Sequence, residues 1–257
     1  MIAITREPSP QMSACELTFV HRAPIDFGLA RQQHAAYCDC LQTLGVEVTR
    51  LPTDELLPDC CFVEDMAIVF DEVALVGRPH LSRLAEQPRI AEELAKHRPL
   101  KSFSPAAKIE GGDVLVIGDT VLVGRSSRTN LVGIHQLEQF VKPMGLAVRA
   151  VDVTGCLHLK TACTAIDEQT LLINPNWIAA DSLSGFQLIE VPAAEPFAAN
   201  TVPIAGSLLA ARSAPDTASL LRSRGRDVIT LDISEFQKAE AGLSCLSLLV
   251  PTTECPG

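Results

Sequence analysis

Four short segments of the chain hold the side chains best suited to chemistry. They are residues 62–65 (FVED), 109–113 (IEGGD), 156–160 (CLHLK) and 242–247 (GLSCLS). A thiolate is a nucleophile, an imidazole transfers protons, and carboxylates bind cations through charge-assisted hydrogen bonds. These segments would form one reactive centre if the fold brought them together.

Cys245 is the candidate nucleophile among the nine cysteines, because Gly242 and Ser244 leave little bulk beside its thiol. A free thiol has a pKa of about 8.5, so a nearby cation is needed to favour the thiolate. A protonated His158 or a cationic substrate would supply that charge. A histidine between two leucines is more often structural, but its place in register with Cys245 favours an acid–base role.

Carboxylates occupy the other two segments. Glu110 precedes two glycines, which allow a ligand to approach the backbone, although glycine and acidic residues are also common in ordinary turns. Glu64 and Asp65 interrupt an apolar stretch, and the nearest basic residues in sequence are Arg50 and Arg78. Because a buried charge must be paired, we expect an external cation as their partner.

Apolar strands recur along the chain at a regular spacing. They start near residues 65, 113, 161, 201 and 244, so consecutive starts lie 40–48 residues apart. The first four continue as hairpins, whereas the fifth has one strand before the chain ends. Residues 2–5 are a suitable partner for that last strand.

Helical patterns follow most of the hairpins, and each is followed by one more strand. Helices are expected at 28–44, 82–97, 129–142, 176–182 and 215–225. Repetition of strand, strand, helix and strand predicts a closed radial α/β array whose strand starts meet at one end of the axis. The array would be one domain, residues 1–257. The alternative is an open α/β sheet with coincidental spacing.

Composition narrows the function. The net charge of −10 argues against nucleic acid and favours a small cationic substrate, although acidity also serves solubility. Apolar runs are strand-sized and the N-terminus lacks a signal-peptide pattern, which predicts a cytoplasmic protein without a membrane contact. The cysteines show no paired spacing, and neither a nucleotide loop nor a His-Glu-x-x-His motif occurs. We therefore expect no metal and no cofactor.

Taken together and in this order, the motifs resemble the dimethylarginine dimethylaminohydrolases of the guanidine-modifying, amidinotransferase-like superfamily. The resemblance also covers residues 128–130 (RTN), 198–200 (AAN) and 33–37 (QHAAY). It implies a five-bladed pseudo-symmetric α/β propeller of ββαβ units, closed by the N-terminal strand. The implied activity is hydrolysis of methylated arginines to citrulline and a methylamine, without a cofactor.

The resemblance also implies roles for single residues. Cys245 would attack the guanidinium carbon, His158 would act as acid and then base, and Glu110 would hold His158. For the substrate it implies a set of binding residues: Asp65, Glu64, Phe62, Asp59, Leu17, Arg128 and Arg83. Within that set, Asp59 would bind the α-amino group and Arg128 the carboxylate. Residues 78–83 form a loop one residue shorter than is usual in the family, which bears on Arg83.

Two alternative functions remain from sequence. The same chemistry would also suit another guanidino or ureido compound, such as arginine or citrulline, because pocket loops select the leaving group. A non-catalytic binding protein on this scaffold is a different class, but binding alone requires no thiol. The sequence does not determine the oligomeric state, and a homodimer is one arrangement compatible with it.

Overall fold

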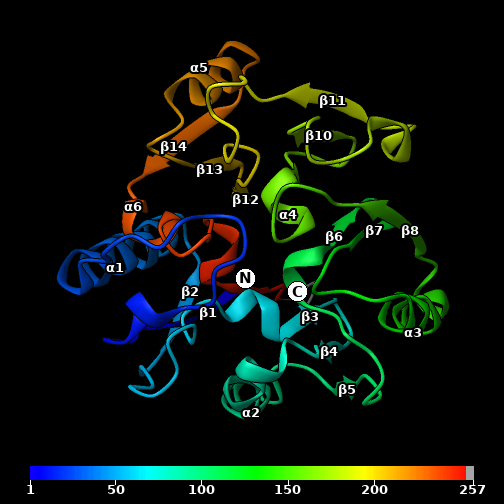
Figure 1. Ribbon diagram of the computed structural model, residues 1–257. Coiled ribbons are helices and arrows are strands. Elements are labelled where there is room, and N and C mark those ends of the chain that lie inside the picture. Colours follow the sequence, from blue (N-terminus) through cyan, green and yellow to red (C-terminus); the bar gives the residue numbers. More distant parts are fainter. Residues whose placement is uncertain (253–257) are drawn as a thin grey trace, which may run out of the picture.

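The structure, a computed structural model, describes residues 1–252 and consists of five three-stranded sheets around a common centre (Figure 1). In each sheet the middle strand is antiparallel to the strand nearest the axis and parallel to the outer strand. From the axis outward, the sheets are β15 (Leu248–Val250), β1 (Ile2–Arg6) and β2 (Glu47–Leu51); β3 (Ala67–Val69), β4 (Ala74–Val76) and β5 (Leu100–Ser102); β6 (Val114–Ile117), β7 (Thr120–Arg125) and β8 (Ala147–Asp152); β9 (Cys163–Ala165), β10 (Thr170–Ile173) and β11 (Gln187–Glu190); and β12 (Val202–Ile204), β13 (Ser207–Ala211) and β14 (Asp227–Leu231).

The N-terminal strand closes the ring, as the sequence predicts. β1 pairs antiparallel with β15, with Ile4 opposite Leu248, and parallel with β2. The fifth blade is therefore assembled from both ends of the chain. The predicted five-bladed α/β propeller is confirmed. The last five residues of the predicted domain, 253–257, lie outside the described part.

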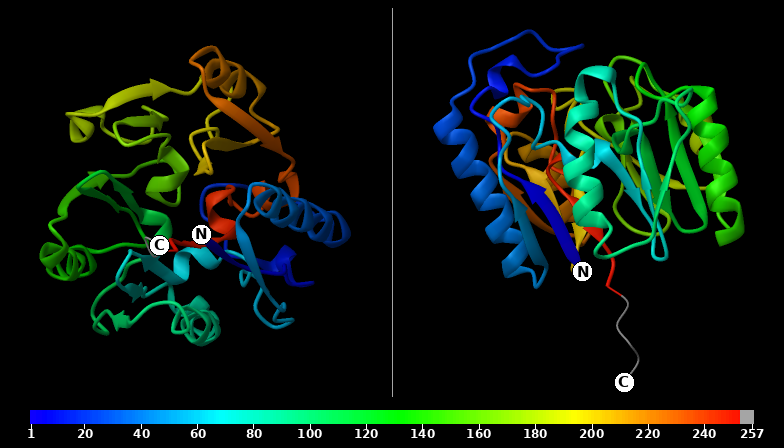
Figure 2. Two further views of the ribbon diagram at one scale, coloured as in Figure 1. Left: turned by 180° about the vertical axis from the view of Figure 1, so that it is seen from behind. Right: turned by 90° about the horizontal axis from the view of Figure 1, so that it is seen from below.

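Helices on the periphery join the middle and outer strands of most blades (Figures 1 and 2). They are α1 (Phe27–Thr43), α2 (Gln87–Leu94), α3 (Leu131–Val141) and α5 (Pro215–Ser223), with the short α4 (Leu159–Ala162) and α6 (Ser234–Gln237) elsewhere. Asn130 begins α3 by accepting a hydrogen bond from the Gly133 N–H, which confirms the expected N-cap. No helix within residues 1–252 is both long and apolar enough to cross a bilayer.

Two helix predictions were too long. Residues 81–86 form a 3₁₀ segment, and α2 begins only at Gln87, because a proline is best tolerated in the first turn of a helix. In the blade of β9, β10 and β11, only the 3₁₀ turn Ala180–Leu183 is present where residues 176–182 were expected to be helical. Neither difference alters the ring.

Single helical turns, rather than strand starts, carry the reactive segments. They are Val63–Met66, Gly111–Asp113, α4 and Ser244–Leu246, and each ends just before the innermost strand of its blade. Successive residues of a helical turn point in widely different directions. Neighbours such as Glu64 and Asp65 can therefore face opposite ends of the axis.

The apolar core lies between adjacent blades. One cluster, for example, joins Leu122 of β7 to Leu171 and Ile173 of β10, and all three side chains are fully buried. Each blade thus packs against two neighbours, and the ring fixes the spacing of the turns at its centre. That spacing determines the geometry of the site.

Candidate active site

One narrow pocket, with a free volume of about 20 Å³, gathers most of the residues predicted from the sequence. Seven of them line it: Asp59, Phe62, Asp65, Arg83, Arg128, His158 and Cys245. Glu110 lies directly behind His158. Glu64 and Leu17 are not among the lining residues, and their positions are described below.

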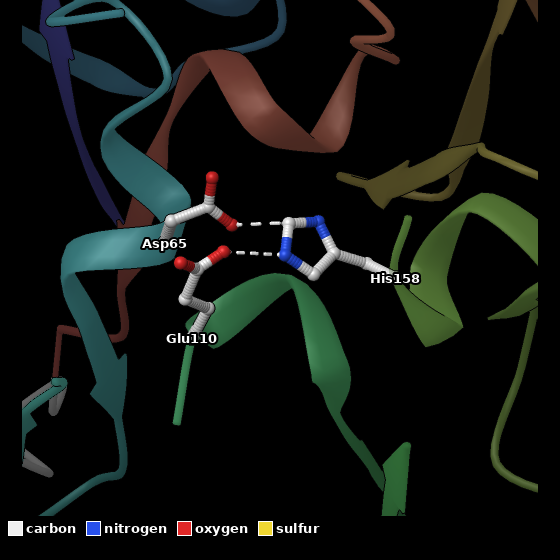
Figure 3. Close-up of side chains that lie close together, drawn as sticks. All are labelled: Asp65, Glu110 and His158. Carbon is white, nitrogen blue, oxygen red and sulfur yellow. Dashed lines mark hydrogen bonds and ion pairs between the residues drawn. The ribbon is translucent and has the colours of Figure 1, made fainter. Parts of the chain in front are cut away.

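Two carboxylates, those of Asp65 and Glu110, approach the His158 ring from the same side (Figure 3). Its Nε2 is 2.6 Å from Glu110 Oε2, and its Nδ1 is 3.8 Å from Asp65 Oδ1. Burial by itself would lower the pKa of His158, but Asp65, Glu110 and Asp113 raise it to about 9. Burial would likewise raise the pKa of Glu110, yet His158 lowers it to about 2. At neutral pH the pair is therefore an imidazolium and a carboxylate.

The backbone around His158 is held by Asp113, whose importance the sequence did not reveal. Its Oδ1 accepts a hydrogen bond from the Leu159 N–H at 2.9 Å, and its Oδ2 accepts one from Thr129 at 2.7 Å. Glu110 also accepts from the His80 N–H and from Arg128. The His158–Glu110 pair is thus held by buried groups on both residues.

Ligand atoms of Asp65, Glu110 and His158 lie within 4.8 Å of one another, a spacing that also suits a metal ion. A metal-bound histidine must be neutral, and the carboxylates that would share the metal are the same groups that raise the pKa of His158. The three side chains thus also form a site in which a proton lies between His158 and Glu110.

Cys245 faces this pocket from the turn Ser244–Leu246 and is partly exposed. Its Sγ accepts a hydrogen bond from the Gly242 N–H at 3.4 Å. Burial, followed by the charges of Glu64 and Asp65, raises the pKa of the thiol above its ordinary value. The raised pKa favours the neutral thiol at neutral pH, and a cation bound beside the two carboxylates would shift the balance toward the thiolate.

Arg83 fills the position where an external cation was expected beside Asp65. Its Nη1 donates to Asp65 Oδ2 at 2.6 Å, and its Nε and Nη2 donate to Glu86. Nη2 also donates to the carbonyls of Asp59 and Phe62. The expectation that Asp65 has no basic partner within the chain was wrong, because Arg83 supplies that charge. Arg83 reaches the pocket despite the shorter loop, but with its donors largely engaged.

Arg128 and Asp59 make fewer and longer side-chain hydrogen bonds than Arg83 does. Arg128 Nη1 is 3.4 Å from Glu110 Oε1, and Asp59 accepts two bonds of 3.3 Å from the Glu16 N–H. Phe62 packs edge-on against Phe236, with ring centroids 6.4 Å apart. An arginine, a carboxylate and an aromatic ring thus line the pocket together.

Glu64 points away from this pocket. Its Oε1 is 2.7 Å from Lys160 Nζ, and its Oε2 accepts a hydrogen bond of 2.7 Å from Ser244. Here too the expected external cation is replaced by a residue of the same chain. Glu64 is close to Cys245 because it binds the hydroxyl of the preceding residue, Ser244, but it lines a different cavity.

Leu17 packs against the first apolar cluster, while its neighbour Glu16 lines the pocket. Glu240 holds this loop by accepting hydrogen bonds from the N–H groups of Thr18, Phe19 and Val20. Its φ of 59° is unusual for a residue with a side chain. No sequence pattern signalled this contact across 220 residues.

Gly112 offers a test of how closely the site is packed. A Cβ at this position would lie 2.8 Å from both Asp65 Oδ1 and His158 Nδ1. We expect Gly112→Ala to lower kcat by about 100-fold, because a small displacement of catalytic groups is costly. Gly145→Ala is the control, since no atom lies within 4 Å of its added Cβ. Because alanine is strained at the φ of 76° of this residue, the melting temperatures of both variants are measured as well. Full activity of a folded Gly112→Ala protein would contradict the packing argument.

Comparisons with known proteins agree with this geometry. A family model described as arginine deiminase matches residues 83–208, just under half of the chain, and the five-bladed α/β fold agrees with that match. The N(G),N(G)-dimethylarginine dimethylaminohydrolase of Streptomyces coelicolor is 39% identical over 249 residues, covering 96% of this chain and 95% of the relative. Its counterpart from Pseudomonas aeruginosa is 33% identical, covering 90% and 92%. The chain therefore belongs to the dimethylarginine dimethylaminohydrolase family.

A solved structure shows the same architecture. The Pseudomonas aeruginosa enzyme, as a cysteine-to-serine variant complexed with citrulline, superposes with a TM-score of 0.92 at 32% identity. The match covers 96% of this chain and 98% of the other.

Proposed function

We propose that this protein hydrolyses Nω-methylated arginines to citrulline and dimethylamine or methylamine. The observation that carries the proposal is the meeting of Cys245, the His158–Glu110 pair and Asp65 in one pocket. Membership of the family and the citrulline complex of the Pseudomonas aeruginosa relative support the same substrate class.

The first half-reaction follows from the electrostatics. A guanidinium bound beside Asp65 lowers the pKa of the Cys245 thiol, which releases its proton to water. The thiolate attacks the guanidinium carbon. Protonated His158 gives its proton to the methylated nitrogen, and the C–N bond breaks with its electron pair going to that nitrogen. A neutral amine and a covalent thiouronium on Cys245 result.

The second half-reaction uses the same histidine as a base. Neutral His158 accepts a proton from a water molecule, and the oxygen of that water attacks the thiouronium carbon. The C–S bond then breaks with its electron pair going to the sulfur. The hydroxyl on the same carbon loses its remaining proton to water, which leaves the urea group of citrulline. Glu110 stabilises the imidazolium each time it forms, as the bond of 2.6 Å implies.

We assign the α-amino and α-carboxylate groups of the substrate to Asp59 and Arg128. Both side chains are more than nine-tenths buried and line the pocket. A carboxylate bound by Arg128 forms paired hydrogen bonds, which a lysine would not match. Glu64 would not contact the substrate. Its negative charge would act only by raising the pKa of the Cys245 thiol. Phe62 and the loop around Leu17 would enclose the aliphatic part.

The proposal is tested by separate incubations with asymmetric dimethylarginine, monomethylarginine, arginine, agmatine and citrulline. Formation of citrulline or ornithine is measured, together with released amine or ammonia. We expect turnover of both methylated arginines and little turnover of the rest. Preferred turnover of arginine would replace the substrate but keep the mechanism, whereas inactivity on all five would remove the enzymatic proposal. A homodimer stays a prediction, to be checked by sedimentation.

A further inference from the structure

A second cavity lies on the axis of the propeller, on the other side of the catalytic turns. Its volume is about 310 Å³, and residues of the innermost strand of every blade line it. Its polar end is formed by Glu64, Gly111, Lys160 and Ser244. Each of these residues lies one or two positions in sequence from a catalytic residue. The floor of the active-site pocket is therefore also the roof of the axial cavity.

The partition between the two cavities is a small network of side chains. Lys160 and Ser244 each contact one oxygen of Glu64 at 2.7 Å. Asn200 completes it by donating to Ser244 Oγ at 2.9 Å and to the Lys160 carbonyl at 3.0 Å. Lys160 has a long flexible side chain and retains 19% exposure, so its movement would open the partition without unfolding the turns.

The far end of the cavity reaches solvent. Val116 of β6 is 40% exposed and Pro203 of β12 is exposed, although both line the cavity. Between this mouth and the partition the wall is mostly aliphatic, including Ile68, Leu115 and Leu248. The N-terminus lies on the mouth side, whereas the loop preceding α1 lies at the opposite face (Figure 2).

The covalent mechanism creates a need for such a passage, and this step rests on the proposed function. When the C–N bond breaks, the rest of the substrate stays attached to Cys245, with its amino-acid end directed to Asp59 and Arg128. It then fills the pocket, whose lining includes Glu16 and Glu240, and the Glu240 carboxylate holds the loop that follows Glu16 through the N–H groups of Thr18 and Val20. The amine must leave before water can take its place at His158.

We propose that the axial cavity is the exit for the amine released in the first half-reaction, and that the Glu64–Lys160 pair separates it from the active site between turnovers. The aliphatic wall suits the methyl groups of a neutral alkylamine, and the polar roof suits its nitrogen. Substrate and citrulline use the outer mouth. The leaving group alone uses the axis.

Narrowing the mouth of the cavity tests this route without touching the catalytic groups. In Val116→Trp the larger side chain would occlude the opening, and Ala165→Phe would do so from the equivalent position of β9. We expect kcat on dimethylarginine to fall by about tenfold in each variant, because product release then limits turnover. The fall should be smaller on monomethylarginine, whose amine is smaller, and citrulline binding should be unchanged.

The matched control is Val132→Trp, a substitution of a 42% exposed valine on the outer surface of α3, which should leave kcat unchanged. Melting temperatures identify any variant that fails to fold. Wild-type kcat in both folded mouth variants would overturn the exit route, as would equal losses on the two substrates. Inactivity of the unmodified protein on methylarginines would instead overturn the proposed function, and the route with it.

Discussion

Replacing Cys245 with serine is expected to lower the turnover of dimethylarginine by at least about 10⁴-fold. The thiol lines the pocket beside His158, and the structure places no other cysteine among the lining residues that it describes there. A serine hydroxyl ionises far less readily, and two nearby carboxylates already oppose ionisation at this position. Binding should survive, because Asp65, Asp59 and Arg128 are unchanged.

The measurement pairs steady-state kinetics with citrulline binding by calorimetry. Cys40→Ser serves as the matched control, since Cys40 is also partly exposed but lies on α1, away from the pocket. We expect the control to retain full activity and both variants to melt near the wild-type temperature. An active, folded Cys245→Ser protein would refute the nucleophile assignment.

Replacing Glu110 with glutamine is expected to lower kcat on the order of 10³-fold. Glutamine keeps the shape and still accepts a hydrogen bond from the His80 N–H, but it removes the charge beside His158. The pKa of His158 should therefore fall, so that a smaller fraction is protonated when the leaving amine needs a proton. The alkaline limb of the kcat profile should move to lower pH.

The same variant should change how stability depends on pH. The pKa of His158 is raised in the folded state, from 6.5 to about 9. The resulting stabilisation, about 3 kcal/mol, is complete below pH 6.5 and is lost as the pH rises through 9. Wild-type stability should thus fall over this window, and Glu110→Gln should show a shallower fall.

Denaturant unfolding at pH 6 and pH 9.5 measures both slopes. Glu138→Gln is the control, because Glu138 lies 3.6 Å from His135 and both side chains are exposed. An exposed pair contributes little, so this variant should follow the wild type. If Glu110→Gln also followed the wild type, the buried pair would not be the source of the pH dependence.

The fold was accessible from sequence because its signals are local. Each innermost strand is a short apolar run after a polar turn, and Asn130 marks the start of α3 by its own side chain. The missing partner of the last strand pointed to residues 2–5, and β1 occupies that place. Repetition made these local signals consistent with one another.

The site was accessible only in part. The sequence named Cys245, His158 and Glu110, and they meet because equivalent turns of a ring share its centre. It did not reveal that Lys160 pairs with Glu64 across 96 residues. Such partners depend on the direction in which a side chain points from a single helical turn. Two neighbouring residues of the turn can therefore face different cavities.

Glu240 and Gly112 illustrate a second limit. In the sequence, Glu240 looks like any acidic residue of a surface loop. Its carboxylate nevertheless accepts hydrogen bonds from three backbone N–H groups of a distant loop. Gly112 matters because of atoms contributed by Asp65 and His158, not because of its own backbone angles. Contacts of this kind follow from tertiary packing and leave no periodic pattern.

The blade shared by β1 and β15 has a consequence for biosynthesis. A chain emerging from the ribosome presents His158 and Glu110 well before the segment that bears Cys245. β1 can pair with β15 and complete the ring only after β15 has been synthesised. The paired residues Ile4 and Leu248 are 244 positions apart in the chain. The pocket that brings Cys245 beside His158 can therefore form only after β15 has been synthesised.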